Sequence, residues 1–292
     1  MKMTRVAIII CLLLGIINIE ATAQVKRSYA MDNPSFTILN KDISEFKILD
    51  TSYLNLIYNM SFAGYLNDST LSGNDQMCLQ IGKYYTKFYS RNMHNNDSTC
   101  TQLLKTQLQV PLNESSWQGY EIYRDLKADK IIVTNRVPYT QTVSRYQEPE
   151  LKIAWKLENE TDTLMGYLCY KATAEVLGRS YVAWYTTDIP IELGPWKFRG
   201  LPGLIIKIYD INNEYKFECI GLSQNKQEIV EYDWKYKDVS KKTWLSFEKD
   251  MYKNAGKFVN STGERVIIMD NSEKGFHVLP DTWQAYYNPI EK

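Results

Sequence analysis

The sequence has few of the residues that most enzymes and metal sites use. It contains two histidines, His94 and His277, among 292 residues. The H-E-x-x-H, G-x-S-x-G and phosphate-loop patterns do not occur in it, which argues against zinc proteases, serine hydrolases and P-loop enzymes. None of its cysteines has the spacing of a zinc site or of a redox C-x-x-C motif. We therefore expect neither a bound metal nor a cofactor.

The chain also lacks an excess of either charge. It has 34 Lys and Arg residues against 34 Asp and Glu residues, so its formal net charge is zero. Nucleic acids and anionic membrane surfaces attract strongly basic proteins, and this balance argues against general binding to either. We expect no nucleic-acid partner.

Beyond residue 19 the sequence lacks an apolar run of the roughly 18 residues that can cross a membrane. The first residues fit a secretory signal peptide, because Lys2 and Arg5 precede an apolar stretch over residues 6–19 and an A-x-A cleavage site at 21–23. We expect a signal peptide over residues 1–23 and one domain over residues 24–292 that does not span a membrane. The expected location is the periplasm or the periplasmic face of the outer membrane.

Four cysteines follow the predicted signal peptide: Cys78, Cys100, Cys169 and Cys219. In an oxidising envelope compartment they could form two disulfide bonds, and the sequence leaves all three pairings open. Buried thiols are the alternative.

The hydrophobic pattern predicts a mainly β, α+β fold. Short segments rich in β-branched and aromatic residues, separated by turn residues, predict strands near 53–62, 78–90, 120–123, 130–134, 151–157, 164–176, 181–187, 204–209, 215–220 and 266–269. A polar loop is expected at 91–98. Helical spacing predicts a helix over 99–109 directly after it and a second helix over 240–258. Because the predicted hairpins follow one another without helical crossovers, we expect a curved antiparallel sheet with one or two covering helices. One version of this prediction is a sheet curved into a half-barrel.

Residues 194–205, Gly-Pro-Trp-Lys-Phe-Arg-Gly-Leu-Pro-Gly-Leu-Ile, stand out from the rest of the chain. Pro202 and Gly203 suit the two central positions of a type II turn, in which Gly203 takes a positive φ. The apolar run that follows over 204–209 predicts a buried strand. The chain is therefore expected to reverse at this turn and to enter the core.

Residues 200–205 spell the motif that names the GLPGLI family, which the chain resembles over nearly its whole length after residue 23. Matching features are Trp155, Tyr167-x-Cys169-x-Lys171-Ala172, Gly178-Arg179, Ala183-Trp184, Ile189-Pro190, Gly194-Pro195-Trp196 and Asn288-Pro289-Ile290-Glu291. The resemblance implies an exported Bacteroidetes protein with a largely β fold and no assigned activity, and it supplies no catalytic residue. A weaker likeness, of shape alone, is to the curved half-barrels of periplasmic lipoprotein carriers.

The residues around the motif form the candidate binding site. In this hypothesis the apolar side chains form a docking patch, and Lys197 and Arg199 meet a phosphate or carboxylate on a lipid or an outer-membrane partner protein. Alternatively, the aromatic side chains pack beneath the loop and the two cations extend to water. The candidate residues are Trp184, Trp196, Lys197, Phe198, Arg199, Gly200, Leu201, Pro202, Gly203 and Leu204.

Three functions remain open from the sequence. The first is a non-catalytic binding module of the cell envelope for an outer-membrane partner or an apolar or lipid ligand. The second is an envelope hydrolase with dispersed carboxylates, for which Asp188 and Glu192 beside the motif are the candidates. The third is a purely structural envelope protein.

Overall fold

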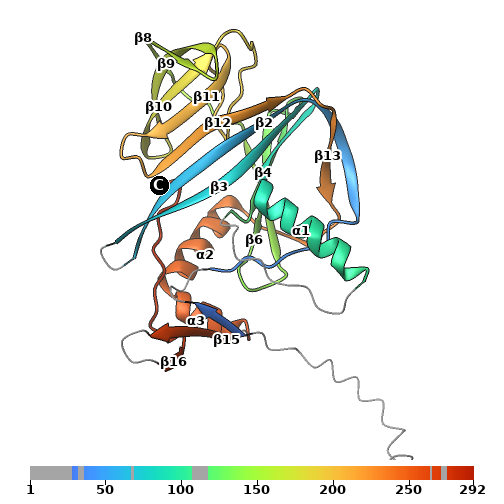
Figure 1. Cartoon of the computed structure of the whole chain (residues 1–292), viewed down its shortest axis with the longest axis vertical. Helices are drawn as coiled ribbons and strands as arrows, with labels where there is room; N and C mark the ends of the chain where they lie inside the picture. The colour runs from blue at the N-terminus through green and yellow to red at the C-terminus, as the bar shows by residue number, and fades with distance from the viewer. Residues whose placement is uncertain (1–27, 32–35, 67–68, 107–117, 264, 271–274) are drawn as a thin grey trace, which may run out of the picture.

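The computed structural model describes residues 28–31, 36–66, 69–106, 118–263, 265–270 and 275–292 (Figure 1). The predicted signal peptide lies outside these residues. Two sheets are present in the described part of the chain. The larger one contains β2 (Phe46–Leu66), β3 (Ser69–Gly82), β4 (Tyr85–Ser90), β5 (Tyr120–Asp125), β6 (Lys130–Arg136), β7 (Val143–Pro149), β8 (Lys156–Leu164), β9 (Tyr167–Val176), β10 (Arg179–Thr186), β11 (Leu204–Asp210), β12 (Tyr215–Ser223), β13 (Gln227–Tyr232) and β14 (Tyr236–Asp238).

The large sheet is open and almost entirely antiparallel. Its strand order is β14-β7-β6-β5-β4-β3-β2-β12-β11-β10-β9-β8, with β13 paired to one end of β2. The pair β14–β7 is parallel. The mainly β prediction is therefore confirmed, and Figure 1 shows the sheet bending along its length. The half-barrel version stays a prediction.

Strand alternation explains why these segments form a sheet. In β2 the side chains of Leu54, Leu56, Tyr58 and Met60 are buried, while their neighbours in the strand are more exposed. Alternate residues of a strand point to opposite faces, so these four side chains lie on one face. That face carries the main hydrophobic core.

A second, smaller sheet contains β1 (Ser28–Met31), β15 (Arg265–Asp270) and β16 (Gly275–Val278). Among the residues that the structure describes, three helices accompany the sheets: α1 (Arg91–Leu104), α2 (Lys241–Lys253) and α3 (Ala255–Ser261). In Figure 1, α2 lies along one side of the large sheet, and α3 follows it towards the small sheet. None of these helices is long and apolar enough to cross a membrane.

The helix predictions were right in kind and wrong in their bounds. Residues 91–98, predicted as a polar loop, form the first two turns of α1, because the Ser90 hydroxyl accepts a hydrogen bond from Met93 N at 3.0 Å and caps the helix. The predicted helix over 240–258 is two helices, since the backbone leaves the helical conformation at Asn254.

Two strand predictions were also wrong in their bounds. The segment 78–90 is the end of β3, a tight turn and β4, and the Asp50 carboxylate stabilises the turn by accepting hydrogen bonds from Tyr84 N at 2.6 Å and Tyr85 N at 3.0 Å. The strands predicted near 151–157 and 164–176 placed a turn between them, but residues 158–162 lie within β8, and the chain reverses at Met165 and Gly166, which both have positive φ.

Candidate functional site

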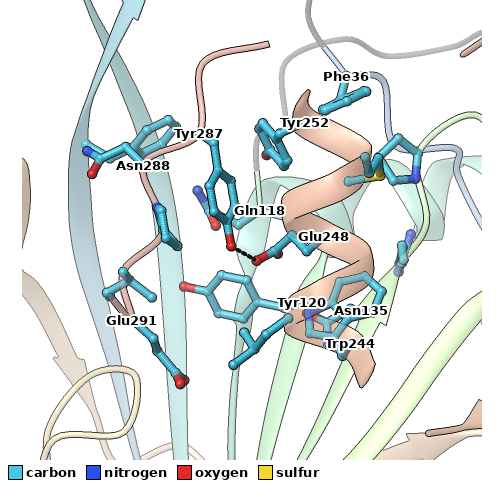
Figure 2. Close-up of a pocket in the computed structure, with 18 of the residues that line it drawn as sticks. Phe36, Gln118, Tyr120, Asn135, Trp244, Glu248, Tyr252, Tyr287, Asn288 and Glu291 are labelled. Carbon is cyan, nitrogen blue, oxygen red and sulfur yellow. Dashed lines mark hydrogen bonds between the residues drawn. The ribbon is translucent and has the colours of Figure 1, made fainter. Parts of the chain in front are cut away.

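A cavity of about 410 Å³ lies between the large sheet, helix α2 and the closing segment, residues 283–291. Strands β5, β6 and β7 form its floor, to which β2 and β12 add Phe62 and Tyr215. Helix α2 forms one wall and the closing segment forms the other (Figure 2). Most lining side chains are apolar or aromatic, which is the usual composition of a small-molecule site.

Helix α2 presents one stripe of side chains to the cavity. The helix begins at the Ser240 cap, whose hydroxyl accepts a hydrogen bond from Thr243 N at 3.0 Å. Trp244, Glu248 and Met251 follow at spacings of four and three residues, which places them on the same face, and all three line the cavity. Glu248 is therefore the acidic residue in an otherwise apolar stripe.

The Glu248 carboxyl is the most perturbed acid of this site. Tyr287 of the closing segment donates a hydrogen bond from its hydroxyl to Glu248 Oε2 at 3.1 Å (Figure 2). Burial raises the pKa of Glu248 to about 7, the charge of Glu291 adds to the rise, and the Tyr287 hydrogen bond and Lys197 oppose it. The rings of Tyr120, Trp244 and Tyr252 surround the same region in Figure 2.

A second polar group lies on the floor of the cavity. Asn135, on β6, lines the cavity with a buried amide nitrogen that has no hydrogen-bond partner among the residues described here. Buried amide groups usually have a partner, so this nitrogen is an unsatisfied hydrogen-bond donor in the floor of the cavity.

Four charged side chains form a cluster beside the motif, and two of them, Lys197 and Glu291, line the cavity. The Lys197 ammonium forms ion pairs with both Glu148 and Glu291. Lys241 forms ion pairs with the same two carboxylates, at 2.6 Å in each case. Lys197 is 2% exposed, and its carboxylate partners offset the cost of burying its charge. With two ammonium groups and two carboxylates, this charged cluster is neutral as a whole.

The closing segment and Lys292, which follows it, are held by β10 and by the turn between β9 and β10. The guanidinium of Arg179 donates hydrogen bonds to Asn288 Oδ1 at 2.5 Å and to Pro289 O at 2.7 Å. The Lys292 backbone N–H donates to Leu177 O at 2.9 Å. Side chains far apart in the sequence therefore fix one wall of the cavity.

The motif residues are largely inside the protein. Phe198, Leu201 and Leu204 have no measurable exposure, and Trp196 is 3% exposed. Trp196 and Lys197 line the cavity, whereas the other three belong to the core. The predicted docking patch would need the loop to open before these apolar side chains could touch a partner, so that role stays a prediction.

Four of the remaining candidates around the motif are exposed or half-buried. Gly200 and Pro202 are exposed, and Trp184 is half-buried. Arg199 forms ion pairs with Asp129 at 3.2 Å and Glu150 at 3.6 Å. The cation that the sequence assigned to an anionic ligand is therefore already paired with carboxylates of the chain.

Gly203 is required for a different reason from the one the sequence predicted. Its φ of +157° is not that of a type II turn, and its N–H donates to Leu201 O at 2.7 Å. A Cβ at this position would lie 2.0 Å from Thr186 O. Close approach of the neighbouring backbone thus selects glycine here.

The structure does not bring the proposed catalytic carboxylates together in a cleft. Asp188 and Glu192 are both exposed to solvent, which removes the basis for the hydrolase hypothesis at these residues. The four cysteines of the described chain are free thiols, and Cys100, Cys169 and Cys219 are buried, which corresponds to the buried-thiol alternative. Burial raises the pKa of the Cys219 thiol to about 11, as expected of an unreactive core cysteine.

Glu248 and Tyr287, the acid and its hydrogen-bond donor at the centre of this site, were not predicted from the sequence. Glu248 falls between the apolar positions that predicted the helix, and that pattern does not distinguish it from the other polar residues of the helix. Tyr287 lies in an irregular segment without a hydrophobic period. The one available signal was the density of aromatic residues near the end of the chain.

A family model described as "Protein of unknown function (Porph_ging)" matches residues 175–207. The matched stretch runs from the end of β9 through the motif into β11. No curated protein matches the chain.

Two solved structures of PNGF-II, in P21 and C2 crystals, are similar to the chain at 14% identity, with TM-scores of 0.48 and 0.46. Each match covers 70% of this chain. This chain spans about a third of the length of the PNGF-II chains, 34% and 33%. A DUF1329 family protein from Desulfovibrio piger ATCC 29098 matches at 13% identity and a TM-score of 0.27, covering 62% of this chain and 86% of its own. These likenesses are too distant to assign an activity.

Proposed function

We propose that the chain is an exported cell-envelope protein that binds an apolar ligand, including the acyl part of a lipid, in the cavity between α2, the closing segment and the sheet. The cavity carries this proposal. Its volume of about 410 Å³ lies within the range of roughly 300–1,000 Å³ that is typical of small-ligand sites. Its lining combines many apolar and aromatic side chains with a few polar groups, including Glu248 and Asn135.

Membership of the GLPGLI family and residence in the periplasm or on the periplasmic face of the outer membrane belong to the same proposal. They are supported by the motif at residues 200–205 and by the signal-peptide pattern at residues 1–23. In this proposal the motif supports the binding site from the interior of the protein. Its buried turn fixes the loop that brings Trp196 and Lys197 to the cavity wall.

A cavity-filling substitution tests the proposal. Residues 24–292 would be titrated with N-phenyl-1-naphthylamine, a neutral apolar dye whose fluorescence rises in apolar surroundings. Ala285 lines the cavity, so Ala285→Phe should weaken dye binding by roughly tenfold or more. Ala128 is exposed on the β5–β6 turn, and Ala128→Phe is the matched control that should bind like the wild type.

Circular dichroism would first establish that each variant is folded. Should Ala285→Phe fail to fold, Leu245→Trp fills the cavity from the other wall. A wild-type protein that does not bind the dye, or folded filling variants that bind as tightly as Ala128→Phe, would show the proposal to be wrong.

A further inference from the structure

The charges around the cavity leave one acid without a cation. Lys197 and Lys241 are paired with Glu148 and Glu291. Glu248 takes part in no ion pair among the residues that the structure describes. A ligand that enters this cavity therefore meets a neutral charged cluster at one end and a single carboxyl on α2.

The cations at this site are not available to an anionic ligand. Lys197 already lies between two carboxylates, and Arg136, which also lines the cavity, is paired with Asp97 through both of its terminal nitrogens. A phosphate or carboxylate on a ligand would have to displace one of these buried pairs. Breaking a buried pair leaves an uncompensated charge, so this exchange is unfavourable.

The surroundings of Glu248 favour a positive charge instead. A buried carboxylate without a cation is costly, and an ammonium group beside it removes that cost. The nearby rings of Tyr120, Trp244 and Tyr252 add to the attraction, because a desolvated cation is stabilised by the faces of aromatic rings. The protein already uses this interaction at the edge of the cavity, where Lys197 Nζ lies 5.1 Å from the Trp196 ring centroid.

We propose that the ligand of this cavity is an amphipathic amine, with its ammonium group paired to Glu248 and its apolar body against the aromatic lining. This inference rests on the proposed binding function and narrows the class of ligand. It reverses the charge preference that Lys197 and Arg199 suggested in the sequence.

Three unbranched probes of ten carbon atoms each, which differ in their head group, separate the alternatives. Decylamine, decanol and decanoate would each compete with the bound naphthylamine dye at pH 7.5, below the concentrations at which they form micelles. For the wild type, half-displacement should occur at a decylamine concentration roughly tenfold or more below that of decanol. Decanoate should be the weakest competitor.

Glu248→Gln tests which residue provides the preference. This variant should bind decanol as the wild type does and should lose the preference for decylamine. Glu160→Gln, at an exposed carboxylate paired with Lys171, is the matched control and should leave all three values unchanged. Glu248→Asp retains the charge and should retain the preference, which keeps the test decisive if Glu248→Gln is poorly folded.

The outcomes distinguish this inference from the proposed function. Equal displacement by decylamine and decanol, stronger displacement by decanoate, or a preference that persists in Glu248→Gln would overturn the amine assignment while leaving an apolar ligand site in place. Failure of the dye and of all three probes to bind would instead overturn the proposed function itself.

Discussion

Replacing Gly203 by alanine tests whether close backbone contact, and not turn chemistry, holds the motif in place. The added Cβ would lie 2.0 Å from Thr186 O and 2.7 Å from Thr186 C. Carbon and oxygen atoms normally approach no closer than about 3.3 Å, so the two backbone segments must separate by roughly 1.3 Å. Thr186 pairs with Leu204 at the end of β10 and β11, and the separation breaks this pairing and loosens the packing of the fully buried Leu204.

We expect Gly203→Ala to lower the free energy of unfolding by about 3 kcal/mol, as severe core mutations do. Gly166 provides the matched control, because it has a φ of +82° and no atom within 4 Å of an added Cβ. Gly166→Ala should cost only about 1 kcal/mol, the strain of the left-handed conformation. Urea denaturation followed by tryptophan fluorescence would measure both values. A Gly203→Ala loss no larger than that of Gly166→Ala would refute the reasoning.

Two further predictions concern the charges of the site. Lys197→Met leaves Glu148 and Glu291 with Lys241 alone, so it should lower the free energy of unfolding by about 3 kcal/mol. The control is Lys207→Met, which removes a half-buried ion pair at the surface and should lower it by less than about 1 kcal/mol. Equal losses in urea denaturation would contradict the buried cluster. Folding raises the pKa of Glu248 from 4.5 to about 7, so the folded chain holds this proton to higher pH than the unfolded chain does. Its contribution to stability is therefore lost as the pH rises from 4.5 through about 7, and Glu248→Gln should remove this part of the pH dependence. An unchanged slope in the variant would show that Glu248 is not the titrating group.

The strands that could be predicted from the sequence are those whose own residues carry the signal, either as alternation or as a short apolar run. Residues 215–220 show this pattern, and β12 extends over Tyr215–Ser223 with Tyr215, Phe217 and Cys219 buried. The run at 204–209 was also predicted as a buried strand, and β11 is Leu204–Asp210. Alternation was sufficient for β12, whereas Leu204, Ile205 and Ile206 of β11 are buried in succession, so a continuous apolar run predicted that strand.

Elements whose burial depends on distant partners were not predicted correctly. Asp97 made residues 91–98 resemble a polar loop, yet its side chain is 1% exposed because it pairs with Arg136 from β6. Glu248 likewise acquires its environment from the floor of the sheet and from Tyr287 of the closing segment. Neither pairing leaves a local pattern in the sequence, so charged residues that are buried by partners appear as surface residues.

The position of the closing segment within the chain has a consequence for the order of folding. One wall of the cavity consists of residues 283–291, which a ribosome adds after every strand of the large sheet has been made. Contacts as distant in sequence as Asn288 with Ala63 close a long loop, so they are expected to form late in folding. A chain that lacks residues 283–291 has no closed cavity. The cavity is therefore among the last features of the fold to form.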